Sequence, residues 1–147
     1  LLILDNIQDP GNLGTIIRSA VAFNLDTLIL SNDCVDLYND KTIRSSEGML
    51  FKLNILREDL NIFLPELKNN NYTIYGTNVV DGSIVGDIKF PKKYAIIIGN
   101  EGSGLKDTLK TFVDQNIYIP MSPNAESLNA GIAASIIMYE MSKNDYE

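Results

Sequence analysis

Three segments of the chain combine glycines or prolines with side chains that could take part in catalysis. They are DPGNLGTIIRSA at residues 9–20, IIIGNEGSGL at residues 96–105 and IPMSPNAESLNAGIAASI at residues 119–136. Their polar and charged side chains include Asn12, Arg18, Glu101, Ser127 and Asn129. Such a set can hold a substrate by hydrogen bonds and stabilise developing negative charge. We therefore expect the three segments to meet at one site.

The stretch from residue 117 to residue 139 has the highest concentration of residues that could bind a ligand or take part in catalysis. Pro120 and Pro123 end an apolar run, because proline cannot donate a ladder hydrogen bond and restricts the residue before it. A helix rich in small residues is predicted to open at residues 127–129, and its apolar stripe at helical spacing consists of Leu128, Ile132, Ile136 and Tyr139. An ordinary strand, turn and buried helix would explain the alanines. It would not explain why two prolines, a serine (Ser127) and an asparagine (Asn129) all lie near one strand end. We interpret the segment as a ligand-binding loop.

The glycines of GNEGSGLK at residues 99–106 suggest a phosphate-binding loop, but their spacing does not fit one. Gly99, Gly102 and Gly104 do not form GxGxxG, and a leucine separates Gly104 from the lysine that a Walker motif requires. A plain tight turn is the alternative. It leaves unexplained the acid Glu101 among these glycines.

The elements that would position these segments follow from the hydrophobic pattern. Apolar runs predict strands at residues 1–5, 27–30, 53–56, 73–78, 94–98 and 117–120. Helices are expected from about residue 15 and over residues 41–46, 60–68 and 106–112, besides the helix after residue 127. Alternating strands and helices indicate an α/β fold with a parallel sheet covered by helices on both faces. Ligands bind such sheets beyond the carboxyl ends of the strands, and Arg18 is expected one turn into its helix.

Composition limits the possible functions. The 147 residues are 45% hydrophobic and 21% charged, as expected of one globular domain, and the net charge of -7 argues against a broad basic nucleic-acid face. Lys41, Arg44 and Lys52 form a modest basic group that we interpret as a solvated face. There is no histidine and only one cysteine, Cys34, so we expect no metal site and no internal disulfide. We see no signal peptide or membrane-length apolar run, and we expect a cytoplasmic protein that does not associate with a membrane.

The three segments, in this order, resemble the three motifs of the SpoU family of RNA ribose 2′-O-methyltransferases. Asn12 and Arg18 match the first motif, Gly99 and Glu101 the second, and residues 119–121 with 127–129 the third. Residues 34–55 further resemble the ribosomal-RNA branch, whose members carry an N-terminal RNA-binding domain. Because residue 1 already lies inside a strand, we expect residues 1–147 to be the catalytic domain of a longer protein. The loop at residues 122–126 departs from the family, in which it is commonly richer in glycine.

The resemblance implies a fold, a cofactor and a set of site residues. The fold is a parallel-sheet α/β knot, a deep trefoil knot near the C-terminus, in a homodimer that buries the first and last helices. Met138 and Met141 would extend the apolar edge of that interface. The implied cofactor is S-adenosyl-L-methionine, and its expected binding residues are Thr77, Asn78, Gly99, Asn100, Gly102, Ile119, Met121, Ser127 and Leu128. The implied catalytic residues are Arg18, Asn12, Glu101, Ser127 and Asn129.

The leading hypothesis is a ribose 2′-O-methyltransferase that acts on RNA, with ribosomal RNA favoured. This reaction requires no metal or histidine, because the methyl group of the sulfonium is already activated and the enzyme mainly aligns the reactants. Alternatives are a transfer RNA ribose 2′-O-methyltransferase, a non-catalytic nucleotide-binding module of flavodoxin type, and a dimeric RNA-binding module that has lost turnover. Two roles stay open for Arg18: a neutral general base, or a charged group that stabilises the developing alkoxide.

Overall fold

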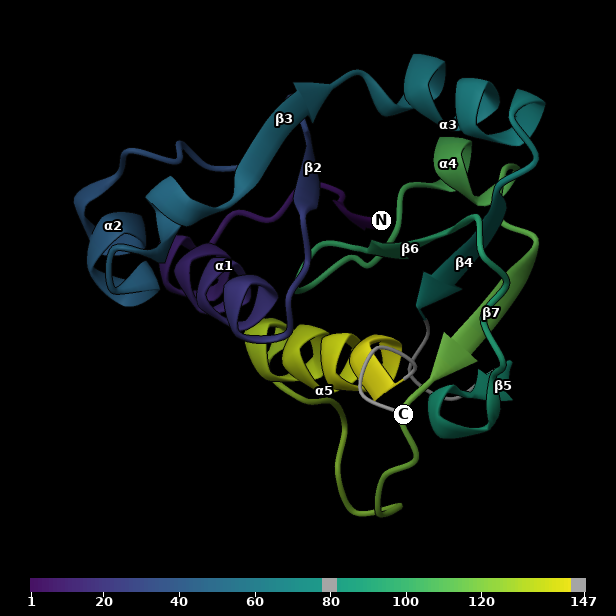
Figure 1. Ribbon diagram of the computed structural model, residues 1–147. Helices are drawn as coiled ribbons and strands as arrows, with labels where there is room; N and C mark the ends of the chain where they lie inside the picture. The colour runs from purple at the N-terminus through teal and green to yellow at the C-terminus, as the bar shows by residue number, and fades with distance from the viewer. Residues whose placement is uncertain (78–81, 144–147) are drawn as a thin grey trace.

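A seven-stranded sheet forms the centre of the computed structural model, which describes residues 1–77 and 82–143 (Figure 1). The strands are β1 (Leu2–Leu4), β2 (Thr27–Ser31), β3 (Asn54–Glu58), β4 (Thr73–Thr77), β5 (Ser83–Ile84), β6 (Tyr94–Ile98) and β7 (Gln115–Tyr118). They lie in the order β3-β2-β1-β6-β4-β7-β5, and every pairing is parallel. The predicted α/β class is confirmed. β5 was not predicted, and β7 begins and ends two residues before the expected limits.

Helices cover both faces of the sheet. They are α1 (Pro10–Ala22), α2 (Asp40–Ser46), α3 (Leu60–Asn69), α4 (Asp107–Lys110) and α5 (Ala130–Ser142), with short 3-10 helices η1 (Met49–Lys52) and η2 (Val85–Asp87). Residues of α1 and α5 share one hydrophobic core with Leu2 and Leu4, whereas α3 and α4 share the other with Ile3. Alternate residues of β1 therefore enter opposite cores, which explains why the central strands are continuous apolar runs.

The first helix begins earlier than the sequence pattern indicated. Asp9 caps it, because its Oδ1 accepts hydrogen bonds from the backbone N–H groups of Gly11 at 2.7 Å and Asn12 at 3.3 Å. Pro10 follows at the first helical position, where its fixed φ and missing N–H fit a helix start. The expected start near residue 15 is therefore wrong, and Arg18 lies more than two turns into the helix instead of one.

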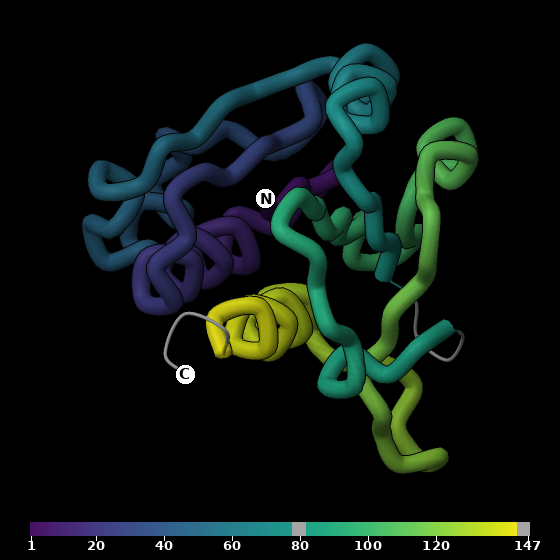
Figure 2. Tube along the Cα trace, turned by 45° about the vertical axis from the view of Figure 1, so that its right-hand side comes forward, coloured from purple at the N-terminus to yellow at the C-terminus, as the bar shows by residue number. Residues whose placement is uncertain are grey.

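The last helix lies between segments that precede it in the chain (Figure 2). On one side α5 packs on α1, where the hydroxyls of Ser19 and Ser135 are 2.7 Å apart. A Cβ added to Gly131 would stand 3.2 Å from the side chain of Thr15, so this glycine allows the close approach. On the other side α5 contacts η2, in the connection between β4 and β6. The expected knot requires this enclosure of the C-terminal helix.

Candidate active site

The side chain of Glu101 joins the first and second polar segments. Its Oε2 accepts hydrogen bonds from the backbone N–H of Asp9 at 2.7 Å and from the Asn12 amide at 3.3 Å. Its Oε1 accepts one from the backbone N–H of Gln8 at 3.1 Å. Asn12 is buried, whereas Glu101 lies at the surface. One carboxylate thus fixes the loop after β6 to the start of α1.

The charge of Glu101 follows from these contacts. Partial burial by itself raises the pKa of this carboxyl. Hydrogen bonds from its own backbone N–H, from Asp9 and Gln8, and from the Asn12 amide outweigh burial, so the pKa lies below its ordinary value of 4.5. At neutral pH, Glu101 is an ionised hydrogen-bond acceptor.

The loop after β6 is braced by Asn100. Its amide donates to the backbone carbonyl of Asn6 at 2.7 Å, and its Oδ1 accepts from the backbone N–H groups of Gly102 and Ser103. The loop folds back tightly, since a Cβ on Gly99 would stand 2.4 Å from the backbone carbonyl carbon of Gly104. Only glycine fits at position 99. The loop is therefore a tight turn, which was the alternative interpretation, and it also holds Glu101 against α1.

The third segment reaches the same sheet edge and ends at the start of α5. The helix begins at Ala130, three residues later than expected, because Asn129 is its N-cap. The Asn129 Oδ1 accepts hydrogen bonds from the backbone N–H groups of Gly131 at 2.9 Å and Ile132 at 3.2 Å. Ser127 and Leu128 precede the helix and are exposed. Asn129 thus has a structural role that the sequence pattern did not reveal.

Arg18 does not touch the cluster around Glu101. Its guanidinium is exposed on α1 and forms an ion pair with Glu47 at 3.2 Å. Glu47 ends α2 in the left-handed conformation, with φ of 52°, which non-glycine residues seldom adopt. No local pattern in the sequence singled out Glu47. Asp9, in contrast, could have been recognised as an N-cap, because it directly precedes Pro10.

The chain is similar to known proteins over most of its length. A model of the SpoU rRNA Methylase family matches residues 1–139. The chain belongs to this family. It is 40% identical over 141 residues to the 23S rRNA (guanosine(2553)-2'-O)-methyltransferase RlmP of Bacillus subtilis, a match that covers 96% of this chain and 57% of that protein.

Two solved structures are similar to this SpoU chain. The SpoU methyltransferase AviRb from Streptomyces viridochromogenes, in complex with AdoMet, has a TM-score of 0.89 and 33% identity over 99% of this chain and 57% of that one. An AdoMet-bound rRNA methyltransferase from Sinorhizobium meliloti has a TM-score of 0.90 and 29% identity over 99% and 56%. The chain spans little more than half the length of these relatives.

The third segment, at residues 119–136, has features that suit a nucleoside-bearing cofactor. The backbone N–H and C=O groups of Ile119, Met121 and Leu128 lie in the irregular stretch between β7 and α5, outside every strand and helix. Ile119 and Met121 are half-buried and Leu128 is exposed, so apolar surface lies beside these donors and acceptors. A planar base with a polar edge needs this combination. The Thr77 hydroxyl donates to the carbonyl of Ile97 at 3.1 Å, and Asn78 lies outside the described residues.

The apolar stripe predicted on the last helix, α5, does not face the core. Leu128, Ile132 and Tyr139 are 37%, 51% and 50% exposed. The buried face of α5 instead includes Met138 and Met141, so these methionines do not form the exposed apolar edge that we expected. The helix is apolar on nearly all sides, and periodicity cannot show which side meets the sheet.

A second cluster, which sequence reasoning missed, lies at the carboxyl ends of β1 and β2. Asp5 is fully buried, its Oδ2 accepts from the backbone N–H of Lys106 at 3.1 Å, and its Oδ1 lies 3.6 Å from the Lys106 ammonium. That ammonium also pairs with Asp33. The hydrogen bond to Asp33 raises the pKa of Lys106 despite partial burial, so Lys106 stays charged. The cluster anchors the loop that carries Glu101.

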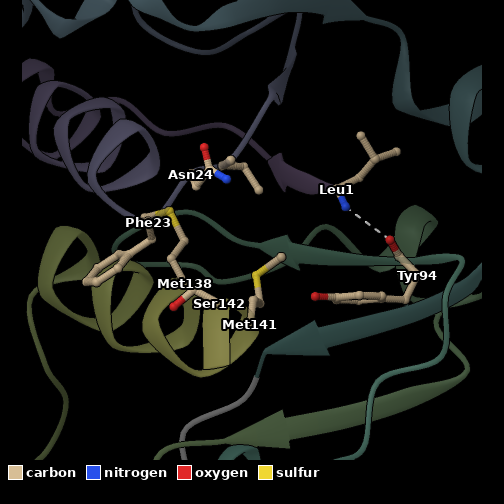
Figure 3. Close-up of a pocket in the computed structure, with 8 residues that line it drawn as sticks. Leu1, Phe23, Asn24, Tyr94, Met138, Met141 and Ser142 are labelled. Atoms are coloured by element: carbon tan, nitrogen blue, oxygen red, sulfur yellow. Dashed lines mark hydrogen bonds between the residues drawn. The ribbon is translucent and has the colours of Figure 1, made fainter. Parts of the chain in front are cut away.

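A small cavity of about 110 Å³ lies at the opposite, amino-terminal edge of the sheet (Figure 3). Its walls include Leu1, Phe23, Tyr94, Met138 and Met141. None of the candidate site residues lines this cavity, so it is separate from the site.

Two features are absent from the part of the chain that the structure describes. No group of three or more histidine, cysteine or acidic side chains is placed there to hold a metal ion. No helix among residues 1–77 and 82–143 is long and apolar enough to cross a bilayer.

Proposed function

We propose that the chain is the catalytic domain of an S-adenosyl-L-methionine-dependent RNA methyltransferase that modifies a ribose 2′-hydroxyl, with ribosomal RNA as the favoured substrate. The observation that carries this proposal is the contact of Glu101 with Asn12, which assembles two SpoU motifs at one sheet edge. The relative in Bacillus subtilis is named as a 23S rRNA 2'-O-methyltransferase. A cytoplasmic location agrees with such a substrate.

The cofactor would lie along the third motif and the loop after β6. Backbone groups of Ile119, Met121 and Leu128 would hold the adenine, with Ser127, Thr77 and Asn78 near by. From the loop after β6, Gly99, Asn100 and Gly102 would add contacts. When bound, S-adenosyl-L-methionine supplies a methyl group already activated on a sulfonium.

The side chains of this chain would position the substrate. Arg18, exposed and charged, would contact a phosphate and stabilise the developing alkoxide, which is less demanding than a role as a neutral base. Glu101 stays ionised and holds Asn12 and the start of α1 in place. Ser127 and Asn129 flank the start of α5, where Asn129 also caps the helix.

The proposed assembly is a knotted homodimer. The exposed apolar side chains of α5, Ile132 and Tyr139, offer a surface for a second copy, in place of Met138 and Met141. The relatives are longer than this chain. A further RNA-binding domain before residue 1 accords with that difference.

A methyl-transfer assay with labelled S-adenosyl-L-methionine on bulk ribosomal RNA and bulk transfer RNA tests the function. Label in ribosomal RNA, released as 2′-O-methylated nucleoside, is the expected result, and label confined to transfer RNA would reassign the substrate. Calorimetry should show binding of S-adenosyl-L-methionine and none of flavin mononucleotide or NAD. Binding of a nucleotide of the flavin or nicotinamide type alone would instead support a flavodoxin-like module.

A further inference from the structure

Residues 38–52, which include α2 and η1, pack on α1 beside the candidate active site and expose basic and aromatic side chains. We call these side chains the α2 surface, which consists of Tyr38, Lys41, Arg44, Phe51 and Lys52. All five residues are exposed. Residues 38–52 contain three of the 12 basic residues of the chain and only two of its 19 acidic ones. This surface is therefore locally basic on an acidic protein.

The two rings need an explanation that a solvated charged face does not give. Phe51 is 73% exposed and Tyr38 65%, the two highest values among the large hydrophobic residues that the structure describes. An exposed apolar residue on its own is ordinary. Two exposed aromatic rings and three exposed basic side chains in one short segment instead provide the residue types on which unpaired bases stack while cations contact the phosphates.

The α2 surface reaches the candidate active site through Lys41. A Cβ built on Gly11 would stand 3.3 Å from Cε of Lys41 and 3.7 Å from its ammonium nitrogen, so the lysine lies over the first turn of α1, next to Asn12. Neither Lys41 nor Arg44 forms an ion pair with any residue in the described ranges. Being three positions apart on α2, they share one side of the helix. Both charges are available to an anionic partner.

The position of α2 is fixed by close packing on α1. A Cβ at Gly14 would collide with Ser45, and the Ser45 hydroxyl donates to the carbonyl of Lys41 at 2.6 Å. At the far end of α2, Glu47 pairs with Arg18. Lys41 of α2 thus lies near the start of α1, and Glu47 after α2 pairs with Arg18 further along α1.

We propose that the α2 surface binds the single-stranded RNA that flanks the nucleotide to be methylated. The RNA phosphates contact Lys41 and Arg44, and unpaired bases stack on Phe51 and Tyr38. This inference rests on the proposed function, because it takes RNA as the substrate and places it beside Asn12 and Arg18. It replaces the interpretation of Lys41, Arg44 and Lys52 as a merely solvated face.

The test measures binding of a fluorescent 12-nucleotide single-stranded RNA of mixed sequence, and of the same RNA as a duplex, to the full chain in the presence of S-adenosyl-L-methionine. The variants are Phe51→Ser, Tyr38→Ser and Lys41→Gln. The matched controls are Ile62→Ser, exposed on α3, and Lys92→Gln, exposed before β6. Calorimetric cofactor affinity and thermal unfolding of each variant report whether the fold is intact.

Phe51→Ser is expected to weaken single-strand binding by about fivefold or more while leaving duplex binding nearly unchanged, because stacking needs unpaired bases. Lys41→Gln should lower the slope of log affinity against log salt by about 0.7. The controls should bind like the wild type.

The inference would be overturned by equal losses in the controls, by no loss in the α2 variants, or by no RNA binding by the wild-type chain at low salt. RNA binding that depends on Phe51 without methyl transfer would refute the proposed function alone. Methyl transfer at the wild-type rate in all three α2 variants would refute this inference alone.

Discussion

Gly14 of α1 lies directly under Ser45 of α2, so close that a Cβ at position 14 would stand 1.8 Å from the serine Oγ and 2.8 Å from the carbonyl oxygen of Thr42. Backbone as well as side chain blocks that space. The two helices therefore approach each other at a distance that only glycine allows. This contact sets where Lys41 and Glu47 stand relative to Asn12 and Arg18.

Gly14→Ala is expected to destabilise the protein by about 1–3 kcal/mol, because the added methyl group forces α2 away from α1. The higher helix propensity of alanine offsets only about 1 kcal/mol. Thermal unfolding measures the loss. Gly86→Ala is the matched control, since its nearest neighbour would be 3.8 Å away, and it should change little. A Gly14→Ala protein as stable as the wild type would contradict the packing described.

Glu101→Gln should destabilise the protein at neutral pH by about 1 kcal/mol, because the single oxygen of an amide cannot accept from all the donors that surround the carboxylate. The folded-state pKa of Glu101 is lowered, so its contribution is complete above the ordinary value of 4.5 and is lost as the pH falls through the lower folded value. The stability difference between wild type and variant should therefore shrink below about pH 4.5. Urea unfolding at several pH values measures it, and Glu66→Gln, on the exposed surface of α3, controls for the lost charge. A difference that stays constant down to acid pH would refute the assignment.

Asn129→Ala should cost about 1 kcal/mol, since it removes the acceptor for the first N–H groups of α5. Asn129→Asp keeps that acceptor and should unfold like the wild type. If Asn129 also positions substrate, the aspartate variant will lose methyl transfer without losing stability. Asp59→Ala removes the cap of α3 on the other face of the sheet and should lower stability but spare turnover. Full activity in both Asn129 variants would restrict this residue to capping.

Arg18→Ala is expected to abolish methyl transfer and spare cofactor affinity. Arg18→Lys should retain little activity, because an ammonium cannot reproduce the planar fork of a guanidinium. Single-turnover methylation and calorimetry separate the two effects. Glu47→Gln, which removes the partner of Arg18, should keep most of the turnover. Near wild-type methylation by Arg18→Ala would remove Arg18 from the chemistry.

Local sequence patterns were enough to predict the sheet and the three segments at its edge. Continuous apolar runs predicted β1, β2, β4 and β6 within one or two residues, since strands buried on both faces need apolar side chains at every position. Prolines and glycines placed the loops at strand ends. The motif residues Asn12 and Glu101 could be named from the resemblance to the SpoU motifs, because each motif is a short contiguous stretch of sequence.

Tertiary structure alone decided which of these residues meet. Asn12 contacts Glu101 across 89 positions of sequence, and Arg18 pairs with Glu47 rather than with the site loop. Periodicity could not orient α5, because a helix that is apolar on nearly all sides has no preferred buried face until its neighbours are present. Long-range contacts of this kind depend on how the strands are ordered in the sheet, and no local pattern encodes that order. The position of α2 over Gly14, and with it that of Lys41, is fixed only when two distant segments pack.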